Sequence, residues 1–254
     1  MGILTLIQEQ NSFPGITNKL LAKKVNRICV AYEGMAKYFP KEKIVLTGNP
    51  IRKEMIEIQG KEEAALKLFN LSSEKPVVLV IGGSQGALSI NKSIHSHLNQ
   101  FVENGIQLIW QTGKYFFETA QESAKEYHPK GIRTVAFIDR MDYAYSISDI
   151  VVCRAGATTI AELTRLGKPA ILVPYPHAAA NHQVENAQAL SETGAAVMVY
   201  DNEISEKISG TIMSLIGSDR LGQMSEKCRQ LGKPQAASVI AKHVIHLAQN
   251  YGRP

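Results

Sequence analysis

The sequence is poor in cysteine and contains no long apolar run. Its three cysteines among 254 residues lie far apart and show no metal-ligand spacing, and any single disulfide would leave one cysteine over. No segment approaches the roughly 18 apolar residues that a membrane span requires. The opening residues, MGILTLIQEQ, include neither a basic leader nor a long apolar stretch. We therefore expect a protein of a reducing cytoplasm that is neither exported nor membrane-spanning.

The sequence also lacks long clusters of basic residues. A formal net charge of +5 favours contact with an anion, which could be a nucleotide, a nucleic acid or an acidic membrane face. Lysine and arginine are dispersed, with only short clusters such as Lys23-Lys24, and this dispersal disfavours nucleic acid as the partner.

Short apolar runs alternate with amphipathic stretches almost from end to end, a pattern typical of βαβ units with a parallel sheet. We therefore predict an α/β fold. The turn signal at Asn49-Pro50 and the charged segment that follows it predict a domain junction between Gly48 and Pro76. The predicted strands cover residues 3–7, 28–31, 44–47, 77–81, 106–111, 134–137, 150–153, 170–173 and 195–199.

A glycine-rich segment follows the predicted strand 77–81 and leads into a helix. Glycines let backbone N–H groups approach an anion, and a helix N-terminus adds partial positive charge, so phosphate is the natural ligand. A plain tight turn explains the same residues, and the motif alone does not separate the two. The segment is not a Walker loop, because it contains no Gly-Lys-Ser/Thr. NAD binding is disfavoured as well, because the glycine spacing differs from the dinucleotide motif and no acid ends the next strand. It comprises Gly82, Gly83, Ser84, Gln85 and Gly86.

A second loop of this kind, RAGATT at residues 154–159, follows the strand 150–153 and opens a helix that carries Glu162. Two anion-friendly helix starts in one sheet suggest a diphosphate ligand. Glu162 would lie about one turn into its helix, where it could accept hydrogen bonds from ribose hydroxyls. An acid near a helix start also complements the helix dipole without any ligand.

Further polar residues follow other predicted strands. Gln183 and Asn186 would lie at the carboxyl edge of the sheet and could read sugar hydroxyls, whereas the nearby histidines show no carboxylate partner. Arg52 would face the second domain as a pyrophosphate or nucleotide contact. The backbone at Phe137-Ile138 could read a flat base, although core packing explains these two residues equally well.

Seven segments occur in the order found in the MurG family of glycosyltransferases, and the resemblance runs from Leu4 to about Val199. These segments are LIQEQNSFPGITNKLLAKK, LTGNPIR, GGSQGA with the following IN, WQTGK, FIDRM, CRAGATTIAEL and GKPAILVPYPHAAANHQVENA. The resemblance implies a B-type glycosyltransferase with Rossmann-like parallel sheets. It further implies a remnant of an N-terminal acceptor domain at 1–53 and a linker with a connecting helix at 54–75. A complete UDP-sugar-binding domain would occupy 76–232, and a helix at 233–254 would pack back toward the N-terminal domain.

The resemblance also implies the reaction, in which N-acetylglucosamine moves with inversion from UDP-N-acetylglucosamine to undecaprenyl-pyrophosphoryl-muramoyl-pentapeptide without a metal or other cofactor. Ser84 would bond a phosphate, Glu162 the ribose, Gln183 the sugar, and the Ile138 backbone the uracil. Asn11 would lie near the sugar or reaction centre. The donor-binding pattern of the family falls on Asn11, Arg52, Ser84, Ile138, Ala157, Thr158, Thr159, Glu162 and Gln183.

The sequence departs from the family at its start, because no GGTGGH-like loop with a histidine implicated in catalysis precedes Met1. The catalytic residue therefore stays unassigned, and we expect the isolated chain to bind UDP-sugar weakly without transferring it. The lipid-linked acceptor and the basic surface imply peripheral contact with an anionic membrane at its cytoplasmic face. Two alternatives stay open: a UDP-sugar transferase acting on another lipid acceptor, and a non-catalytic nucleotide-sugar-binding or dinucleotide-binding module.

Overall fold

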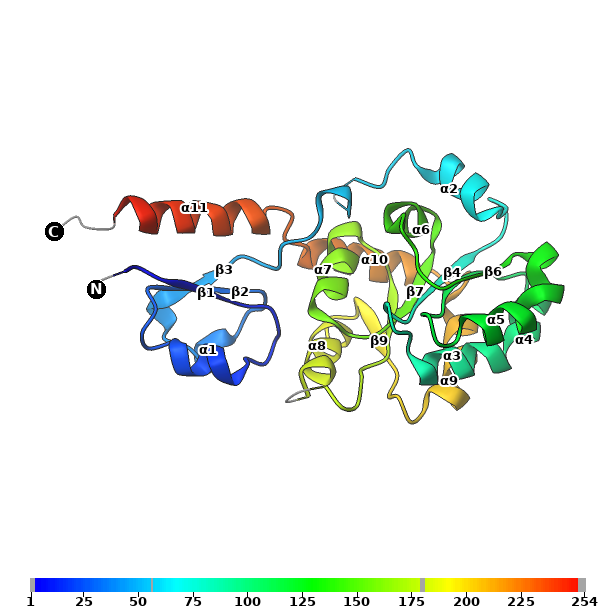
Figure 1. Cartoon of the computed structure of the whole chain (residues 1–254), viewed down its shortest axis with the longest axis horizontal. Coiled ribbons are helices and arrows are strands. Elements are labelled where there is room, and N and C mark those ends of the chain that lie inside the picture. The colour runs from blue at the N-terminus through cyan, green and yellow to red at the C-terminus, as the bar shows by residue number, and fades with distance from the viewer. Residues whose placement is uncertain (1–2, 56, 179–180, 251–254) are drawn as a thin grey trace.

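The computed structural model describes residues 3–55, 57–178 and 181–250, which form two parallel sheets (Figure 1). The smaller sheet has the order β1-β2-β3, and the larger has the order β6-β5-β4-β7-β8-β9. The strands are β1 (Leu6–Glu9), β2 (Arg27–Val30), β3 (Ile44–Leu46), β4 (Val77–Ile81), β5 (Gln107–Gln111), β6 (Ile132–Val135), β7 (Ile150–Cys153), β8 (Ala170–Leu172) and β9 (Ala196–Met198).

Helices connect the strands and cover both faces of the larger sheet, as parallel pairing requires. They are α1 (Ile16–Leu21), α2 (Glu62–Phe69), α3 (Leu88–Ser96), α4 (Leu98–Glu103), α5 (Phe117–Ala124), α6 (Met141–Ile147), α7 (Ala157–Leu166), α8 (His182–Ser191), α9 (Ile204–Leu215), α10 (Arg220–Leu231) and α11 (Ala236–Gln249).

Alternation along the central strands places one core on each face of the larger sheet. Val78 and Val80 of β4 pack in the cluster that contains residues of α3 and α9, whereas Val77 and Leu79 pack in the cluster that contains residues of α6, α7 and α8. All four valine and leucine side chains are buried. Because β4 is covered on both sides, its sequence is an unbroken apolar run rather than an alternating one.

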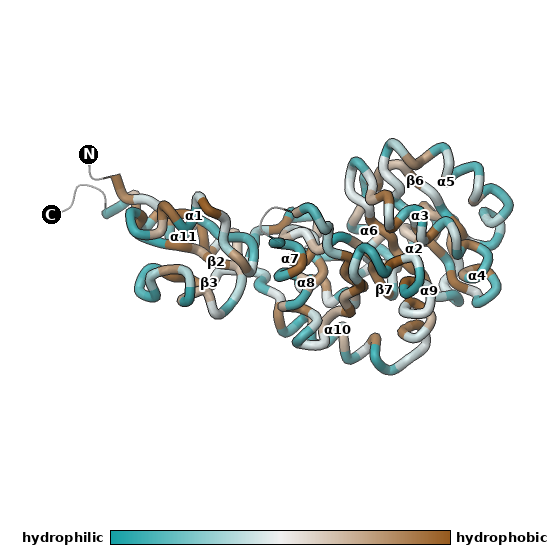
Figure 2. Tube along the Cα trace, turned by 90° about the horizontal axis from the view of Figure 1, so that it is seen from below, coloured by the Kyte–Doolittle hydropathy of each residue, from teal (hydrophilic) through white to brown (hydrophobic). Residues whose placement is uncertain are grey.

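The smaller sheet lies between two helices. Figure 1 shows α11 along one face of this sheet and α1 on the other, and in the rotated view of Figure 2 both helices overlap the sheet. Only Ala236 of α11 is buried, and Val244 and Ile245 stay about half exposed, at 49% and 55%. The helix therefore runs beside the sheet while most of its side chains, including these two apolar ones, stay exposed or half-exposed.

The predicted strands 77–81 and 150–153 are confirmed to the residue, and two others, β1 and β6, are displaced by two or more residues. β1 is Leu6–Glu9 rather than 3–7, because its register pairs Leu6 with Arg27 and Glu9 with Val30. β6 is Ile132–Val135 rather than 134–137, since Ile132 is fully buried beside Leu108 while Phe137 is 57% exposed. Phe137 and Ile138 therefore follow the strand without belonging to it.

Candidate functional site

The order of the larger sheet creates a crevice between β4 and β7. The chain moves from β4 to β5 on one side and later returns to β7 on the other, so the connections leave these neighbouring strands in opposite directions. Ligands of open α/β sheets bind at such a switch point, outside the carboxyl ends of the strands. The loops that follow β4 and β7 both begin there.

The glycine-rich loop (residues 82–87) turns at the end of β4 and packs against the loop after β5. The Gly86 N–H donates to the Gly83 carbonyl at 3.0 Å, and Gly86 has a positive φ of 83°. A Cβ on Gly86 would lie 2.2 Å from the Thr112 carbonyl oxygen, and one on Gly113 would lie 2.1 Å from the Gly86 nitrogen. Only glycine at these two positions permits the two loops to approach so closely. Ser84, in the middle of the glycine-rich loop, is exposed.

Asn91 of α3 holds the loop after β5, against which the glycine-rich loop packs. Its Oδ1 accepts the Trp110 Nε1–H at 3.0 Å, and its Nδ2 donates to the Thr112 carbonyl at 2.7 Å. Asn91 is 1% exposed and Trp110 is fully buried. The same carbonyl therefore contacts both the amide of Asn91 and Gly86 of the loop.

Glu162 of α7 lies next to the crevice with both carboxylate oxygens in contact. Oε2 accepts the Tyr145 hydroxyl at 3.1 Å, and Oε1 is 3.4 Å from Nη2 of Arg52, whose side chain is 58% exposed. Burial, and then the neighbouring Glu162 charge, raise the pKa of Tyr145. The hydroxyl therefore stays protonated and donates a hydrogen bond to Glu162. Arg52 comes from the segment after β3, so two distant parts of the chain meet at Glu162.

The α7 helix begins at Ala157, directly after the RAG turn that follows β7. Its first turn contains Thr158 and Thr159. The backbone N–H groups of this turn have no hydrogen-bond acceptor within the helix, because no turn precedes them. Gly156 precedes the helix in an extended conformation, with φ −70° and ψ 143°. This N-terminus and the glycine-rich loop lie on adjacent strands, an arrangement suited to an anion.

Asn186 joins the two sheets. Its Oδ1 accepts the Ser12 N–H at 2.9 Å, and its Nδ2 donates to Asn11 Oδ1 at 3.0 Å and to the Ala155 carbonyl at 3.3 Å. Asn186 is fully buried, so these protein groups occupy the amide that the sequence suggested as a sugar reader. It instead fastens the loop after β1 to the loop after β7.

Glu9 organises that same N-terminal loop, a role the sequence did not reveal. Its carboxylate is 3% exposed and accepts the backbone N–H of Asn11 at 3.0 Å, the N–H of Gly15 at 3.0 Å and the Asn18 amide at 2.8 Å. The spacing of Glu9, Gly15 and Asn18 matches no motif, because a loop that folds back on a carboxylate has no fixed period. These hydrogen bonds set where Asn11 lies.

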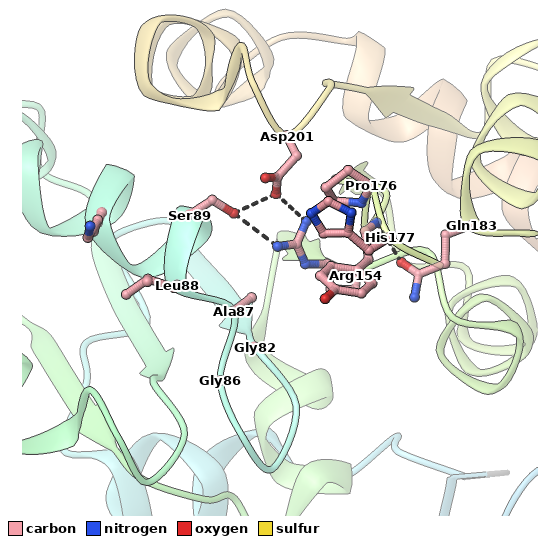
Figure 3. Close-up of a pocket in the computed structure, with 12 residues that line it drawn as sticks. Gly82, Gly86, Ala87, Leu88, Ser89, Arg154, Pro176, His177, Gln183 and Asp201 are labelled. Atoms are coloured by element: carbon pink, nitrogen blue, oxygen red, sulfur yellow. Dashed lines mark hydrogen bonds and ion pairs between the residues drawn. The ribbon is translucent and has the colours of Figure 1, made fainter. Parts of the chain in front are cut away.

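A cavity of about 680 Å³ lies beside the glycine-rich loop, and Figure 3 shows it from the inside. Gly82 and Gly86 line one wall, and Tyr175 and Gln183 line another. Arg154 reaches across from the end of β7 and pairs with Asp201, which follows β9. The cavity therefore brings Gln183 to the glycine-rich loop, from a position about a hundred residues away in the chain.

Ile138 lies beyond the cavity, after β6, where its side chain is 3% exposed and packs in the core. The segment that carries it is anchored by Asp142, which accepts two hydrogen bonds from Arg140 at 2.9 and 2.8 Å and one from Lys61 at 2.9 Å. Hydrogen bonding from Arg140, with help from Lys61, holds the pKa of Asp142 well below its ordinary value. The core contact at Ile138 leaves only its backbone available to a ligand.

The predicted site residues thus fall into four connected groups. The glycine-rich loop shares the cavity with Gln183, and Arg52 pairs with Glu162. Ala157 to Thr159 form the first turn of α7, the helix that carries Glu162. Asn11 is linked to Ala155 through the side chain of Asn186. Of the predicted site residues, only Gly82, Gly86 and Gln183 line the cavity, and the others, Ile138 and Ser84 among them, lie outside its lining. Tyr145, Arg154 and Asp201 touch these groups, and only their place in the tertiary structure reveals it.

Among residues 3–55, 57–178 and 181–250, no helix combines the length and the apolar character that a membrane span needs. Within the same ranges, no three His, Cys, Asp or Glu side chains gather closely enough to hold a metal ion.

Comparison with known proteins gives consistent relatives. Residues 77–242 match the model of the glycosyltransferase family 28 C-terminal domain. The chain is 47% identical over 247 residues to the UDP-N-acetylglucosamine–N-acetylmuramyl-(pentapeptide) pyrophosphoryl-undecaprenol N-acetylglucosamine transferase of Parabacteroides distasonis, covering 97% of this chain and 67% of that protein. The protein of the same name from Porphyromonas gingivalis is 50% identical over 257 residues, again with 67% of its length covered. Among solved structures, Acinetobacter baumannii MurG superposes with a TM-score of 0.77 at 29% identity, covering 98% of this chain and 68% of that one.

Proposed function

The chain belongs to the MurG family of glycosyltransferases, and from that premise we propose that it binds UDP-N-acetylglucosamine and serves in transferring the sugar to undecaprenyl-pyrophosphoryl-muramoyl-pentapeptide. The relatives carry this reaction in their names. The chain spans about two thirds of their length, and this portion contains the sheet with the donor-binding crevice.

One observation supports the proposal most strongly: two glycine-containing helix starts and a buried glutamate meet at the switch point of a parallel sheet. A nucleoside diphosphate needs N–H donors for its phosphates and an acceptor for its ribose. The loop at Ser84 and the first turn of α7 supply the donors, and Glu162 supplies the acceptor. Arg52 adds a cation beside that carboxylate.

The chemistry follows from this assignment. The 4-hydroxyl of the muramoyl group attacks the anomeric carbon and gives up its proton to a base, the bond from that carbon to the diphosphate oxygen breaks, and UDP leaves with the bonding electron pair. Charge therefore develops on the diphosphate in the transition state. N–H groups and helix dipoles already aimed at that position stabilise it without reorganising, an effect that often supplies the largest part of a catalytic barrier reduction.

Each remaining residue has a proposed part in holding the donor. The Ile138 backbone contacts the uracil, since its side chain is committed to the core. Gln183 reads the sugar from the wall of the cavity. Asn11, held by Glu9 and Asn186, lies on the acceptor side of the crevice. The boundaries at residues 53 and 75 between acceptor segment, linker and donor domain belong to the same proposal.

We place the reaction at the cytoplasmic face of the cell membrane, with the protein in peripheral contact. The acceptor in this proposal carries a lipid that stays in the bilayer, so the crevice must work near that surface. The net charge of +5 favours approach to anionic lipids.

Calorimetric titration with UDP-N-acetylglucosamine tests the donor site. We expect binding that exceeds that of UDP-glucose and NAD and that weakens about 10- to 100-fold in Glu162→Gln, because one or two charge-assisted hydrogen bonds to the ribose become neutral. Glutamine still accepts the Tyr145 hydroxyl, so the fold is preserved. Glu63→Gln, an exposed change on α2, is the matched control and should bind as the unaltered chain does. Preference for NAD, or equal affinity in both variants, would overturn the proposal.

A further inference from the structure

Arg154 makes hydrogen bonds to four protein groups at the wall of the cavity. One guanidinium nitrogen donates to the carbonyls of Val173 and Pro174, each at 3.2 Å, and pairs with Asp201. The other donates to Ser89 Oγ at 2.9 Å. Figure 3 shows the guanidinium enclosed between Asp201 and Ser89 at the wall of the cavity. Its hydrogen bonds go to the protein, and its side chain is only 17% exposed.

The carbonyl of Pro174 belongs to the same peptide group as the N–H of Tyr175. A peptide group is planar and rigid, with its C=O and N–H pointing in opposite directions. Arg154 holds the carbonyl end, and the N–H end donates to Gln183 Oε1 at 2.9 Å. One rigid group therefore links the guanidinium to the side chain of Gln183.

This link settles which end of the Gln183 amide is free. An amide oxygen accepts and its nitrogen donates, and a backbone N–H can bond only to the oxygen. Because Tyr175 occupies Oε1 and no partner for Nε2 is found among residues 3–55, 57–178 and 181–250, Nε2 is the end available to a ligand. Figure 3 shows Nε2 of Gln183 turned away from the bonded oxygen.

We propose that Arg154 is a positioning residue that, through the Pro174–Tyr175 peptide group, presents Gln183 to the donor sugar as a hydrogen-bond donor. The group that Gln183 reads is then an acceptor, either a hydroxyl oxygen or the carbonyl of an N-acetyl group. This inference rests on the proposed function, because it concerns the sugar end of the same site. It adds sugar selectivity that the diphosphate contacts do not supply.

The experiment compares the affinities of UDP-N-acetylglucosamine and UDP, measured by calorimetry on the full chain. The ratio of the two isolates the sugar contribution. Gln183→Glu keeps an oxygen for the Tyr175 N–H and replaces the Nε2 donor by a second oxygen. We expect UDP-N-acetylglucosamine to bind about tenfold more weakly, as for one lost hydrogen bond, with UDP changed less than about twofold.

Arg154→Lys removes the planar fork that spans Pro174 and Ser89 while keeping the charge. It should lower the sugar contribution to a similar extent, again with UDP binding nearly unchanged. Asp201→Asn, which leaves the guanidinium in place but weakens its anchor, provides a second variant with the same readout if Arg154→Lys does not fold. The exposed changes Gln121→Glu and Arg220→Lys are matched controls.

A fall in the ratio for Gln183→Glu and for the Arg154 or Asp201 variant, with both controls unchanged, supports the inference. Equal loss of UDP and UDP-sugar affinity in the Arg154 and Asp201 variants overturns it, since that result indicates general structural damage. An unchanged ratio in Gln183→Glu overturns it as well. If the unaltered chain binds UDP no less tightly than the UDP-sugar, the inference fails while nucleotide binding stands. If it binds neither, the proposed function fails too.

Discussion

Replacing Asn91 by alanine tests how the glycine-rich loop is supported. The side chain of Asn91 makes two buried hydrogen bonds, one from Trp110 Nε1 at 3.0 Å and one to the Thr112 carbonyl at 2.7 Å. Alanine leaves both partners buried without these bonds. Each unsatisfied group costs about 1–3 kcal/mol, so Asn91→Ala should lower the free energy of unfolding by about 2–6 kcal/mol.

Denaturant unfolding followed by tryptophan fluorescence measures this loss directly, because Trp110 is the one tryptophan in the sequence and is fully buried. Asn99→Ala is the control. Asn99 makes an exposed hydrogen bond to Glu103 at 2.7 Å, and its removal should cost at most about 0.5 kcal/mol.

A second readout connects this prediction to the site. The Thr112 carbonyl that Asn91 holds also lies against Gly86, so its release should loosen the glycine-rich loop and weaken UDP binding in the folded variant. A loss of stability below about 1 kcal/mol, or one equal to that of Asn99→Ala, would show that the two buried groups find other partners. The account of how the loop is supported would then be wrong.

Two further predictions concern the loop after β5 and the anchor near Ile138. Gly113→Ala places a Cβ 2.1 Å from backbone of the glycine-rich loop and should weaken UDP-sugar binding at least about tenfold. Gly105→Ala, with a similar positive φ but nothing within 4 Å, should lose only stability, so equal calorimetric affinities in both variants would contradict the packing argument. Asp142→Asn should lower the free energy of unfolding near neutral pH by about 1–3 kcal/mol. Because the folded pKa of Asp142 lies below its ordinary value of 3.8, the charged form stabilises the fold above that pH, and its contribution is lost as pH falls through the lower folded value. Denaturation at pH 7, 4, 3 and 2 should show the difference between the two proteins narrowing below pH 4, and a constant difference would refute this assignment.

Much of the donor half could be predicted from local pattern. Unbroken apolar runs located β4 and β7 to the residue, because strands covered on both faces need no polar alternation. Glycines at residues 82–86 and the RAG turn before α7 located the two helix starts, since close backbone approach excludes larger residues. The first and sixth strands were displaced, because register depends on partners that pattern does not specify.

Residues that act through distant partners could not be found in this way. Asn186 appeared to be a sugar reader and is instead a fully buried link to Ser12 and Asn11, more than 170 positions away. Glu9 carried no signal in the sequence, yet it organises an entire loop. A side chain's partners depend on which strands become neighbours, and a sequence carries no direct signal of that order.

The sequence by itself therefore determined the fold class, the family and the identity of the glycine-containing helix starts, because these depend on residue type and spacing within short segments. Only the tertiary structure decided that Arg52 meets Glu162, that Arg154 and Gln183 hydrogen-bond to the two ends of one peptide group, and that Gln183 accepts this bond through its oxygen. The physical reason is that parallel pairing brings loops from separate βαβ units to one edge of the sheet, and hydrogen-bond direction exists only once those loops have met.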